Sequence, residues 1–395
     1  MHINFEIVFR FTIYKIYFCS FLPVFSMNLK IGLLRNVNIK SVEIYTENSY
    51  QIKSSNSDKI HEFSKNDKIR FHVHESKVSF RLNNITIGAF DTIYLKKPNN
   101  DTTSFSIAGI KPSFNKRSYY DELIVFSSKG ELTLVNKVDL EHYLIGVLES
   151  EVGLNQTKDF YKVHSIISRT YALKNQYKFI HEGFNLTDLV NCQVYKGKMY
   201  NHKNIIEAVK ETRNLILVDE NMDYITAAYF SNSGGQTNNV EDVWIKALPY
   251  LRSIHDPYSM DGQNYVWKKK INKKNWLNYL QRNYNFPTDN TIAVNSACNF
   301  KQEIRHKYLI DWVYKIPLTQ IRKDWKLKST YFSIYDNGDG FLTFNGKGFG
   351  HGVGLSQEGA MKMIDLGYDF LDVLRFYYTD VHLIDRRMRD FYLID

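Results

Sequence analysis

Two glutamates near the middle of the chain are the first candidates for chemistry. Glu149 and Glu151 flank Ser150 at the end of a segment with helical periodicity, and Val152 and Gly153 follow them. A carboxylic acid among apolar neighbours has a raised pKa, so it can hold a proton near neutral pH and deliver it to a leaving oxygen. Glutamates at a helix end are more often solvated surface charges, and the spacing alone does not decide between these roles.

A second candidate is His351, which lies where glycine occupies alternate positions from 346 to 354. This segment lacks the Gly-Lys-Ser/Thr ending of a phosphate loop and the G-x-G-x-x-G spacing of a dinucleotide site, so nucleotide binding is disfavoured. Glycines allow the backbone to approach a ligand or another segment closely. We expect them to hold His351 at a turn, although a histidine in a loop is more often structural than catalytic.

The cysteines do not indicate a metal site. Cys19, Cys192 and Cys298 are far apart and form no C-x-x-C pair, so neither a disulfide framework nor a structural zinc site is implied. His181 is too distant from Cys192 to suggest a ligand pair, and tetrahedral zinc needs further ligands. We predict that the protein binds no metal and needs no cofactor, and that Cys192 packs as a small apolar side chain.

Helices and short strands must position these candidates. Apolar residues spaced three and four apart predict a helix over 138–148 and a second over about 158–179. Strands are expected at 215–218 and 225–230. Ser356 has the side chain and position to cap a third helix, which we expect to run to Leu366.

These patterns predict an α+β protein in which a β-rich N-terminal unit packs on a mixed α/β core. Residues 1–26 are apolar but interrupted by Arg10 and Lys15, which is poor for a membrane span. They are either an export signal or anchor, or an upstream extension with no structural role, and both readings stay open. The expected divisions are 1–26, the β-rich unit at 27–130, the first core part at 131–255, an insertion-like segment at 256–316, and the second core part at 317–395.

The net charge of +9 suits an anionic partner such as nucleic acid, a lipid surface or an acidic wall polymer. The chain contains no RNP pattern, zinc-finger spacing or helix-turn-helix signature, and its lysines are scattered through loops. Nucleic-acid binding is therefore not expected.

The order of several segments resembles the SpoIID/LytB family of peptidoglycan lytic transglycosylases, over roughly residues 130–380. The Gly-His-Gly-Val-Gly-x-Ser-Gln stretch is the most specific part, and it follows the others in the order that the family shows. The matching segments are Asp139–Glu151, Lys162, Ser168-Arg-Thr-Tyr-Ala-Leu173, Cys192-Gln-Val-Tyr195, Phe230-Ser-Asn-Ser-Gly-Gly-Gln-Thr237, Trp244, Ile321–Phe332, Gly348–Ala360 and Phe376-Tyr-Tyr378.

The resemblance implies roles for individual residues. Glu151 matches the family's catalytic glutamate, whereas Glu149 stands where the family varies. The residues implied to bind substrate or to brace the cleft are His351, Ser356, Gln357, Gln193, Tyr195, Ser231 and Arg169. The implied partners are peptidoglycan glycan strands and a cell-wall amidase, and the implied location is the cell envelope, with the export signal and membrane anchoring left open.

The implied reaction is cleavage of the bond between N-acetylmuramic acid and N-acetylglucosamine. Glu151 protonates the glycosidic oxygen, and its conjugate base then takes the proton of the muramic acid C6 hydroxyl, which attacks the anomeric carbon to give a 1,6-anhydro end. An attached nucleophile removes the need for a second carboxylate. The alternative is a non-catalytic envelope protein that binds glycan and stimulates an amidase, although pure binding would not require an acid at position 151.

The second helix departs from the family pattern. Where the family shows Lys-Ala-Gln-Ala-Val-Ala-Ala, this chain has Lys162-Val-His-Ser-Ile-Ile-Ser168. His164 thus replaces a glutamine, and larger side chains replace alanines. We expect partner helices to repack or lie farther away, and the shape of the cleft to differ.

Overall fold

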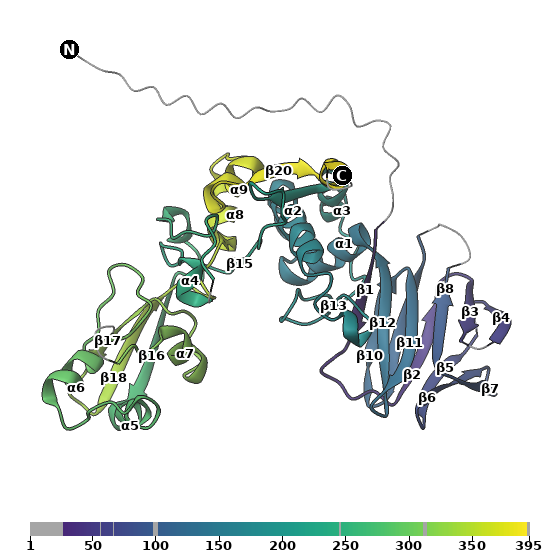
Figure 1. Cartoon of the computed structure of the whole chain (residues 1–395), viewed down its shortest axis with the longest axis horizontal. Coiled ribbons are helices and arrows are strands. Elements are labelled where there is room, and N and C mark those ends of the chain that lie inside the picture. The colour runs from purple at the N-terminus through teal and green to yellow at the C-terminus, as the bar shows by residue number, and fades with distance from the viewer. Residues whose placement is uncertain are drawn as a thin grey trace, which may run out of the picture.

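The computed structural model describes residues 27–55, 57–65, 67–97, 102–244, 246–310 and 314–392. A large β-sheet unit and a smaller sheet with its own helices lie at opposite ends of the molecule, and a group of helices lies between them (Figure 1). The predicted α+β class is confirmed. The expectation about residues 1–26 falls on a segment outside the described residues. None of the helices in the described ranges is long and apolar enough to cross a membrane.

The N-terminal unit consists of two sheets whose apolar faces share one core. Alternation produces these faces: in β2 (Ser41–Thr46), Val42 and Ile44 are buried and the residues between them are not. The first sheet has the order β13 (Leu186–Thr187), β1 (Asn28–Leu33), β12 (Glu131–Asp139), β11 (Glu122–Ser128), β8 (Thr92–Lys96), β3 (Tyr50–Ser54) and β4 (Ser57–Phe63). The second has the order β10 (Ser113–Tyr120), β9 (Ser104–Lys111), β2, β5 (Ile69–His74), β6 (Lys77–Leu82) and β7 (Ile85–Phe90).

Strand β12 leads directly into α1 (Leu140–Glu151). Asp139 ends the strand and caps the helix, because its side chain accepts the Glu141 N–H at 2.8 Å. Since β12 pairs with both β1 and β11, the sheet fixes the start of α1. Gly146 lets the helix approach the following loop, because an added Cβ would lie 2.5 Å from the carbonyl oxygen of Gly197.

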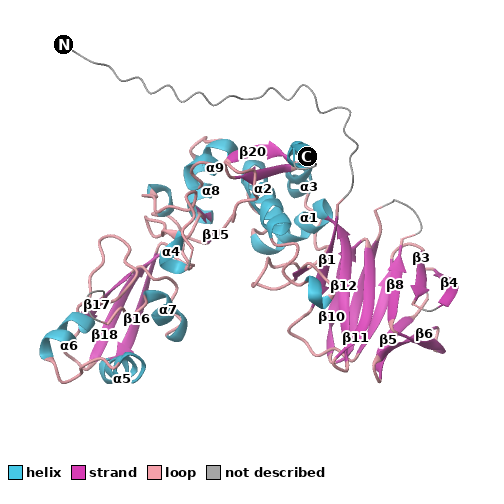
Figure 2. Cartoon of the chain, viewed as in Figure 1, coloured by secondary structure: helices cyan, strands magenta, loops and turns pink. Residues whose placement is uncertain are grey.

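The central group contains further helices and short paired strands (Figure 2). Helix α2 (Lys158–Lys174) ends before the predicted residue 179, because the Asn175 side chain donates to the Tyr171 carbonyl and a turn follows. Ser356 caps α8 (Gln357–Asp365), as predicted. The other elements are η1 (Ile180–Glu182), α3 (Lys203–Glu211), α4 (Val240–Val243), η2 (Pro257–Ser259), α9 (Phe370–Tyr377), α10 (Arg386–Tyr392), β14 (Leu215–Val218) paired with β20 (His382–Asp385), and β15 (Tyr229–Phe230) paired with β19 (Leu355–Ser356). The strand expected at 225–230 therefore forms only at its last two residues.

The smaller sheet forms a unit with its own core around Trp276. It comprises β16 (Val266–Asn272), β18 (Phe341–Lys347), β17 (Phe332–Asp336), α5 (Lys273–Tyr284), α6 (Thr291–Cys298) and α7 (Leu318–Asp324). The boundary expected at residue 316 falls inside this unit, because residues on both sides of it share the cluster. Long-range pairing of β16 with β18 causes this difference, and the local sequence gives no sign of that pairing.

Arg169 ties the central helices together. Its guanidinium is fully buried and forms a two-pronged ion pair with Glu141, with Nε–Oε1 3.0 Å and Nη2–Oε2 2.6 Å. It also donates to the carbonyl oxygen of Leu215 at 3.1 Å. One side chain of α2 thus links the first turn of α1 to β14. Such a geometry satisfies a buried guanidinium.

We expect Arg169→Met to lower the free energy of unfolding by about 3–5 kcal/mol, because it leaves Glu141 without its partner in a largely buried position. Urea unfolding followed by circular dichroism measures this change. Lys203→Met is the matched control: its 3.8 Å pair with Glu207 is exposed, and its loss should cost less than about 1 kcal/mol. Equal effects of the two substitutions would contradict a bracing role for Arg169.

Candidate active site

Glu151 is the last residue of α1 and lies half-buried beside the segment that follows Cys192. Its Oε1 accepts the Val194 N–H at 2.6 Å. Burial raises the pKa of the Glu151 carboxyl, and this effect outweighs the Val194 hydrogen bond and the charge of Lys196, which lower it. The carboxyl is therefore suited to carry a proton to a bound group.

Glu149 occupies a different environment. Its side chain is buried, and its two oxygens accept the backbone N–H groups of Met199, Tyr200 and His202, each at 3.1 Å. Ser150 contributes to the same contact, because its hydroxyl accepts the Lys196 N–H at 3.1 Å. The Glu149 carboxylate thus uses its hydrogen bonds to hold a loop. The Glu151 carboxyl can still accept a hydrogen bond from a ligand.

Two tyrosines lie near the Glu151 carboxylate. Tyr229 in β15 and Tyr171 in α2 both lie close enough for the negative charge of Glu151 to raise their phenol pKa, in addition to the larger effect of burial. Gln193 lowers the pKa of Tyr229 and Cys192 raises that of Tyr171, so each of these residues lies near its tyrosine. Sequence reasoning did not single out either tyrosine. Their positions within or beside two of the segments that carry the family resemblance were the available signal.

His351 reaches this group through the backbone of Tyr229. Its Nδ1 accepts the Val353 N–H at 3.0 Å, and the backbone of Tyr229 lies close enough to the ring to affect its pKa. Burial, with nearby Arg322 and Arg305, lowers the pKa of His351 to about 4, so the imidazole is neutral at pH 7. His351 thus lies beside the strand that carries Tyr229, and its neutral form has no positive charge to offer a substrate.

A glycine permits the close approach of this loop to β15. Gly354 has a φ of +76°, and an added Cβ would collide with the carbonyl of Ala228. Both facts exclude larger side chains at this position. The parallel pairing of Tyr229 with Leu355 and of Phe230 with Ser356 depends on this approach.

Ser356, Gln357 and Ser231 gather at the start of α8. The Ser356 hydroxyl is buried and bonded to Ser259 Oγ at 2.7 Å, and it accepts the Ser233 N–H at 3.2 Å. Gln357 begins α8 and is half-buried, as is Ser231. This group borders the His351 loop through β19. Ser356 acts there as a brace, since it lies wholly beneath the surface.

Three other expected site residues are interior. Arg169 makes the bracing contacts described above, and the Tyr195 hydroxyl donates to Asn136 Oδ1 at 2.9 Å. Gln193 is also buried and lies next to Tyr229. Because these three side chains are buried, they can support the residues of the site but do not line its surface.

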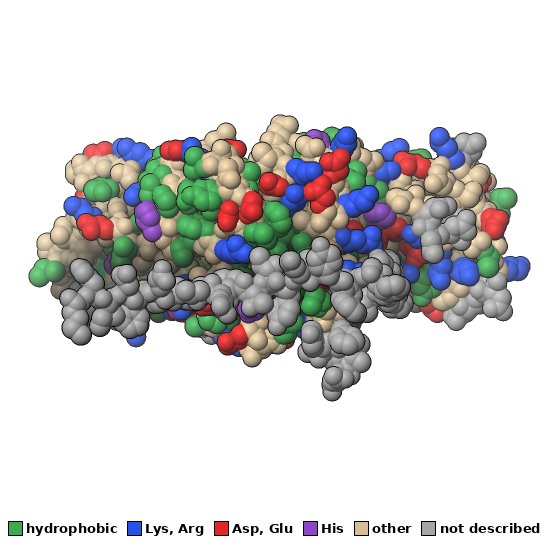
Figure 3. Space-filling model, turned by 90° about the horizontal axis from the view of Figure 1, so that it is seen from above, with side chains coloured by type: hydrophobic (Ala, Val, Ile, Leu, Met, Phe, Trp, Pro, Cys, Tyr) green, Lys and Arg blue, Asp and Glu red, His purple; other side chains and the backbone are tan. Residues whose placement is uncertain are grey.

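Two arginines near the His351 loop form no ion pair with a carboxylate in the described ranges. Arg305 donates to the carbonyl oxygens of Ser233 and Gln236, each at 2.6 Å, and burial lowers its pKa to about 9. Arg322 donates to the Lys328 carbonyl at 3.2 Å. Elsewhere, on the face seen in Figure 3, positive and negative side chains are interspersed. The loop region thus carries local positive charge.

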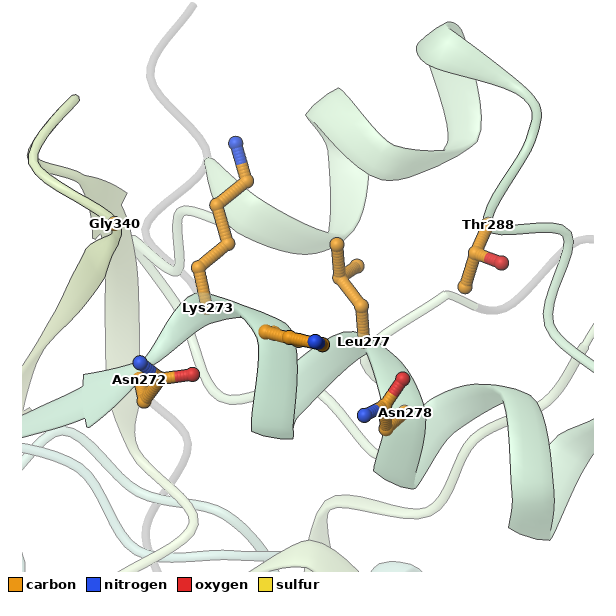
Figure 4. Close-up of a pocket in the computed structure, with 7 residues that line it drawn as sticks. Asn272, Lys273, Leu277, Asn278, Thr288 and Gly340 are labelled. Carbon is orange, nitrogen blue, oxygen red and sulfur yellow. The ribbon is translucent and has the colours of Figure 1, made fainter.

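One pocket lies away from Glu151, at the start of α5 and at the far end of the smaller unit (Figure 4). It is lined by Asn272, Lys273, Lys274, Leu277, Asn278, Thr288 and Gly340. Within the described ranges, no three His, Cys, Asp or Glu side chains are placed to hold a metal ion. The absence of a metal requirement remains a prediction.

Comparison with known proteins finds related chains. A family model described as SpoIID, stage II sporulation protein, matches residues 128–218. The chain is 30% identical over 264 residues to the stage II sporulation protein D of Bacillus amyloliquefaciens, covering 63% of this chain and 75% of that protein. It is similarly 30% identical over 283 residues to an uncharacterized protein of Brachyspira hyodysenteriae, covering 69% and 74%. It is 25% identical over 291 residues to the amidase enhancer of Bacillus subtilis, covering 61% of this chain and 40% of that longer protein.

The raised pKa of Glu151 predicts a pH-dependent effect of Glu151→Gln on stability. Because the folded protein holds the Glu151 proton more tightly than the unfolded chain, the wild type loses stability as pH rises above the ordinary carboxyl value. The amide escapes this loss and still accepts the Val194 N–H. Urea unfolding should therefore show that Glu151→Gln gains stability over the wild type as pH rises above the ordinary glutamate pKa of about 4. Glu220→Gln, at an exposed position, should show no such trend, and a parallel trend in both variants would contradict the assignment.

Proposed function

This chain belongs to the stage II sporulation protein D (SpoIID) family, and on that premise we propose that it is a lytic transglycosylase of bacterial peptidoglycan. It cleaves the bond between N-acetylmuramic acid and N-acetylglucosamine and leaves 1,6-anhydro ends. The observation that carries the proposal is the Glu151 carboxyl, which is half-buried, has a raised pKa and lies near Tyr229 and Tyr171.

One carboxyl performs both proton transfers in this mechanism. Protonated Glu151 gives its proton to the glycosidic oxygen, the bond to the anomeric carbon breaks, and an oxocarbenium-like centre forms. The Glu151 carboxylate then takes the proton of the C6 hydroxyl, whose oxygen closes the anhydro ring. The acid is regenerated, and no water is consumed. An attached hydroxyl has a high effective concentration, so a second carboxylate is not needed.

The environment of Glu149 supports a single-acid mechanism. Its oxygens are occupied by three backbone N–H groups, so it is poorly placed to act as a second catalytic carboxylate. The raised pKa of Glu151 supports its part as the acid, because a larger fraction of the carboxyl stays protonated as pH rises. The neutral His351 lies beside the Tyr229 strand and takes no proton in this scheme.

We propose that the protein acts in the cell envelope, because the cell wall that is its proposed substrate lies there. The amidase enhancer among the relatives favours a second candidate function, in which the chain binds glycan strands and stimulates a cell-wall amidase without cutting them. The two functions are separable, since only cleavage depends on an acid at position 151. A glycan-binding cleft would serve both, and an amidase partner is compatible with either.

Purified protein incubated with peptidoglycan, both intact and stripped of stem peptides, should release fragments with 1,6-anhydromuramic ends, detected by mass spectrometry. We expect Glu151→Gln to lower the rate by about 10²–10⁴-fold, the usual contribution of a general acid–base group. Glu182→Gln, at an exposed position, is the control and should retain the wild-type rate. Anhydro ends absent from both substrates, with amidase stimulation present, would favour the second function instead.

Chelator treatment of the purified protein should leave the rate of glycan cleavage unchanged, because the proposed chemistry needs one carboxyl and an attached hydroxyl. The measurement is the release of anhydro ends before and after dialysis against a strong chelator. A loss of activity that added zinc restores would refute the metal-free mechanism.

A further inference from the structure

Helix α2 presents polar groups to Tyr229 that have no partner within the described chain. His164 is fully buried, and neither of its ring nitrogens has a hydrogen bond. Its ring lies edge-on to that of Tyr229, with 5.1 Å between centroids, and to that of Phe160, with 4.8 Å. The hydroxyl of Ser168, one helical turn away on the same face, is also buried and unpaired.

Gln193 approaches Tyr229 from another segment. Gln193 lies near the Tyr229 phenol, whose pKa it lowers. Its Oε1 accepts the Tyr143 hydroxyl at 3.4 Å, and its Nε2 atom is buried with no hydrogen bond to the described residues. Tyr229 therefore lies near two side chains with unused hydrogen-bonding capacity, His164 in α2 and Gln193 in the segment beside Glu151. The phenol itself is close enough to Glu151 to experience its charge.

His164, Ser168 and Gln193 can form hydrogen bonds with buried water. Burial lowers the pKa of His164 to about 3, so the ring is neutral and offers one donor and one acceptor. Ser168 offers a hydroxyl that can do either, and the Gln193 amide offers a donor. Buried polar groups in native proteins are nearly always hydrogen-bonded, and where protein partners are missing the partner is ordered water held by several such groups.

We propose that His164, together with Ser168 and Gln193, binds buried water beside Tyr229, and that His164 is thereby a positioning residue for the reaction. The bound water restrains the Tyr229 side chain, and Tyr229 in turn limits where the Glu151 carboxyl can point. This catalytic part rests on the proposed function. The binding of water does not.

A crystal structure of the full chain, at a resolution that shows ordered water, tests the site without any activity. We expect water within hydrogen-bonding distance of a His164 ring nitrogen and of Ser168 or Gln193 as well. Ring nitrogens enclosed by apolar atoms, with no water density, would overturn the proposal.

Kinetics of three variants test the positioning role. We expect His164→Leu to lower kcat about tenfold with KM changed less than about twofold, because binding surfaces stay intact while the acid loses its alignment. His164→Gln restores a donor and an acceptor and should recover most of the lost kcat. His382→Leu, at an exposed position in β20, should behave as the wild type.

Wild-type kcat in His164→Leu, or equal losses in His164→Leu and His164→Gln when both melt near the wild-type temperature, would overturn the positioning role. If His164→Leu fails to fold, the comparison of His164→Gln with the wild type and the water density decide the matter. If the wild type itself produces no anhydro ends, the proposed function fails, and the water density alone decides whether the site exists.

Discussion

The end of helix α1 is held in place by backbone N–H groups of one loop, and the position of the Glu151 carboxyl depends on this contact. Val194 donates to Glu151, Lys196 donates to Ser150, and three further N–H groups between 199 and 202 donate to Glu149. Charge-assisted bonds of this kind are stronger than neutral ones. Because β12 fixes the start of α1, the helix is restrained at both ends, and the Glu151 carboxyl has little freedom.

The second half of the chain completes the site by backbone pairing. Strand β19 follows the glycine-rich loop and pairs in parallel with β15, the strand whose Tyr229 lies near both Glu151 and His351. The loop can come this close because Gly354 has no side chain to meet the Ala228 carbonyl. The glycine-rich segment thus contributes through its backbone, which pairs with the strand of Tyr229, a residue that lies near Glu151 although the two are distant in sequence.

Local features of the site were predictable from sequence, and tertiary ones were not. Capping of α8 by Ser356 was predictable, because it depends on residues within one helical turn. The difference between Glu149 and Glu151 could not be read from local sequence, since both are glutamates at one helix end. Only the fold brings the loop at 199–202 under one of them. The pairing of Arg169 with Glu141, and the approach of Tyr171 and Tyr229 to Glu151, likewise depend on elements that meet only after folding. The boundary expected at residue 316 lies inside the smaller unit, because β16 pairs with β18, which is distant in sequence.

The central claim is that an attached hydroxyl of the substrate, and no water molecule, attacks the anomeric carbon after Glu151 has protonated the leaving oxygen. Digestion of peptidoglycan in water enriched in oxygen-18, followed by mass spectrometry of the muramic acid ends, tests this directly. The account predicts 1,6-anhydro ends that carry no heavy oxygen. Reducing muramic ends that each carry one heavy oxygen would show hydrolysis and would contradict it.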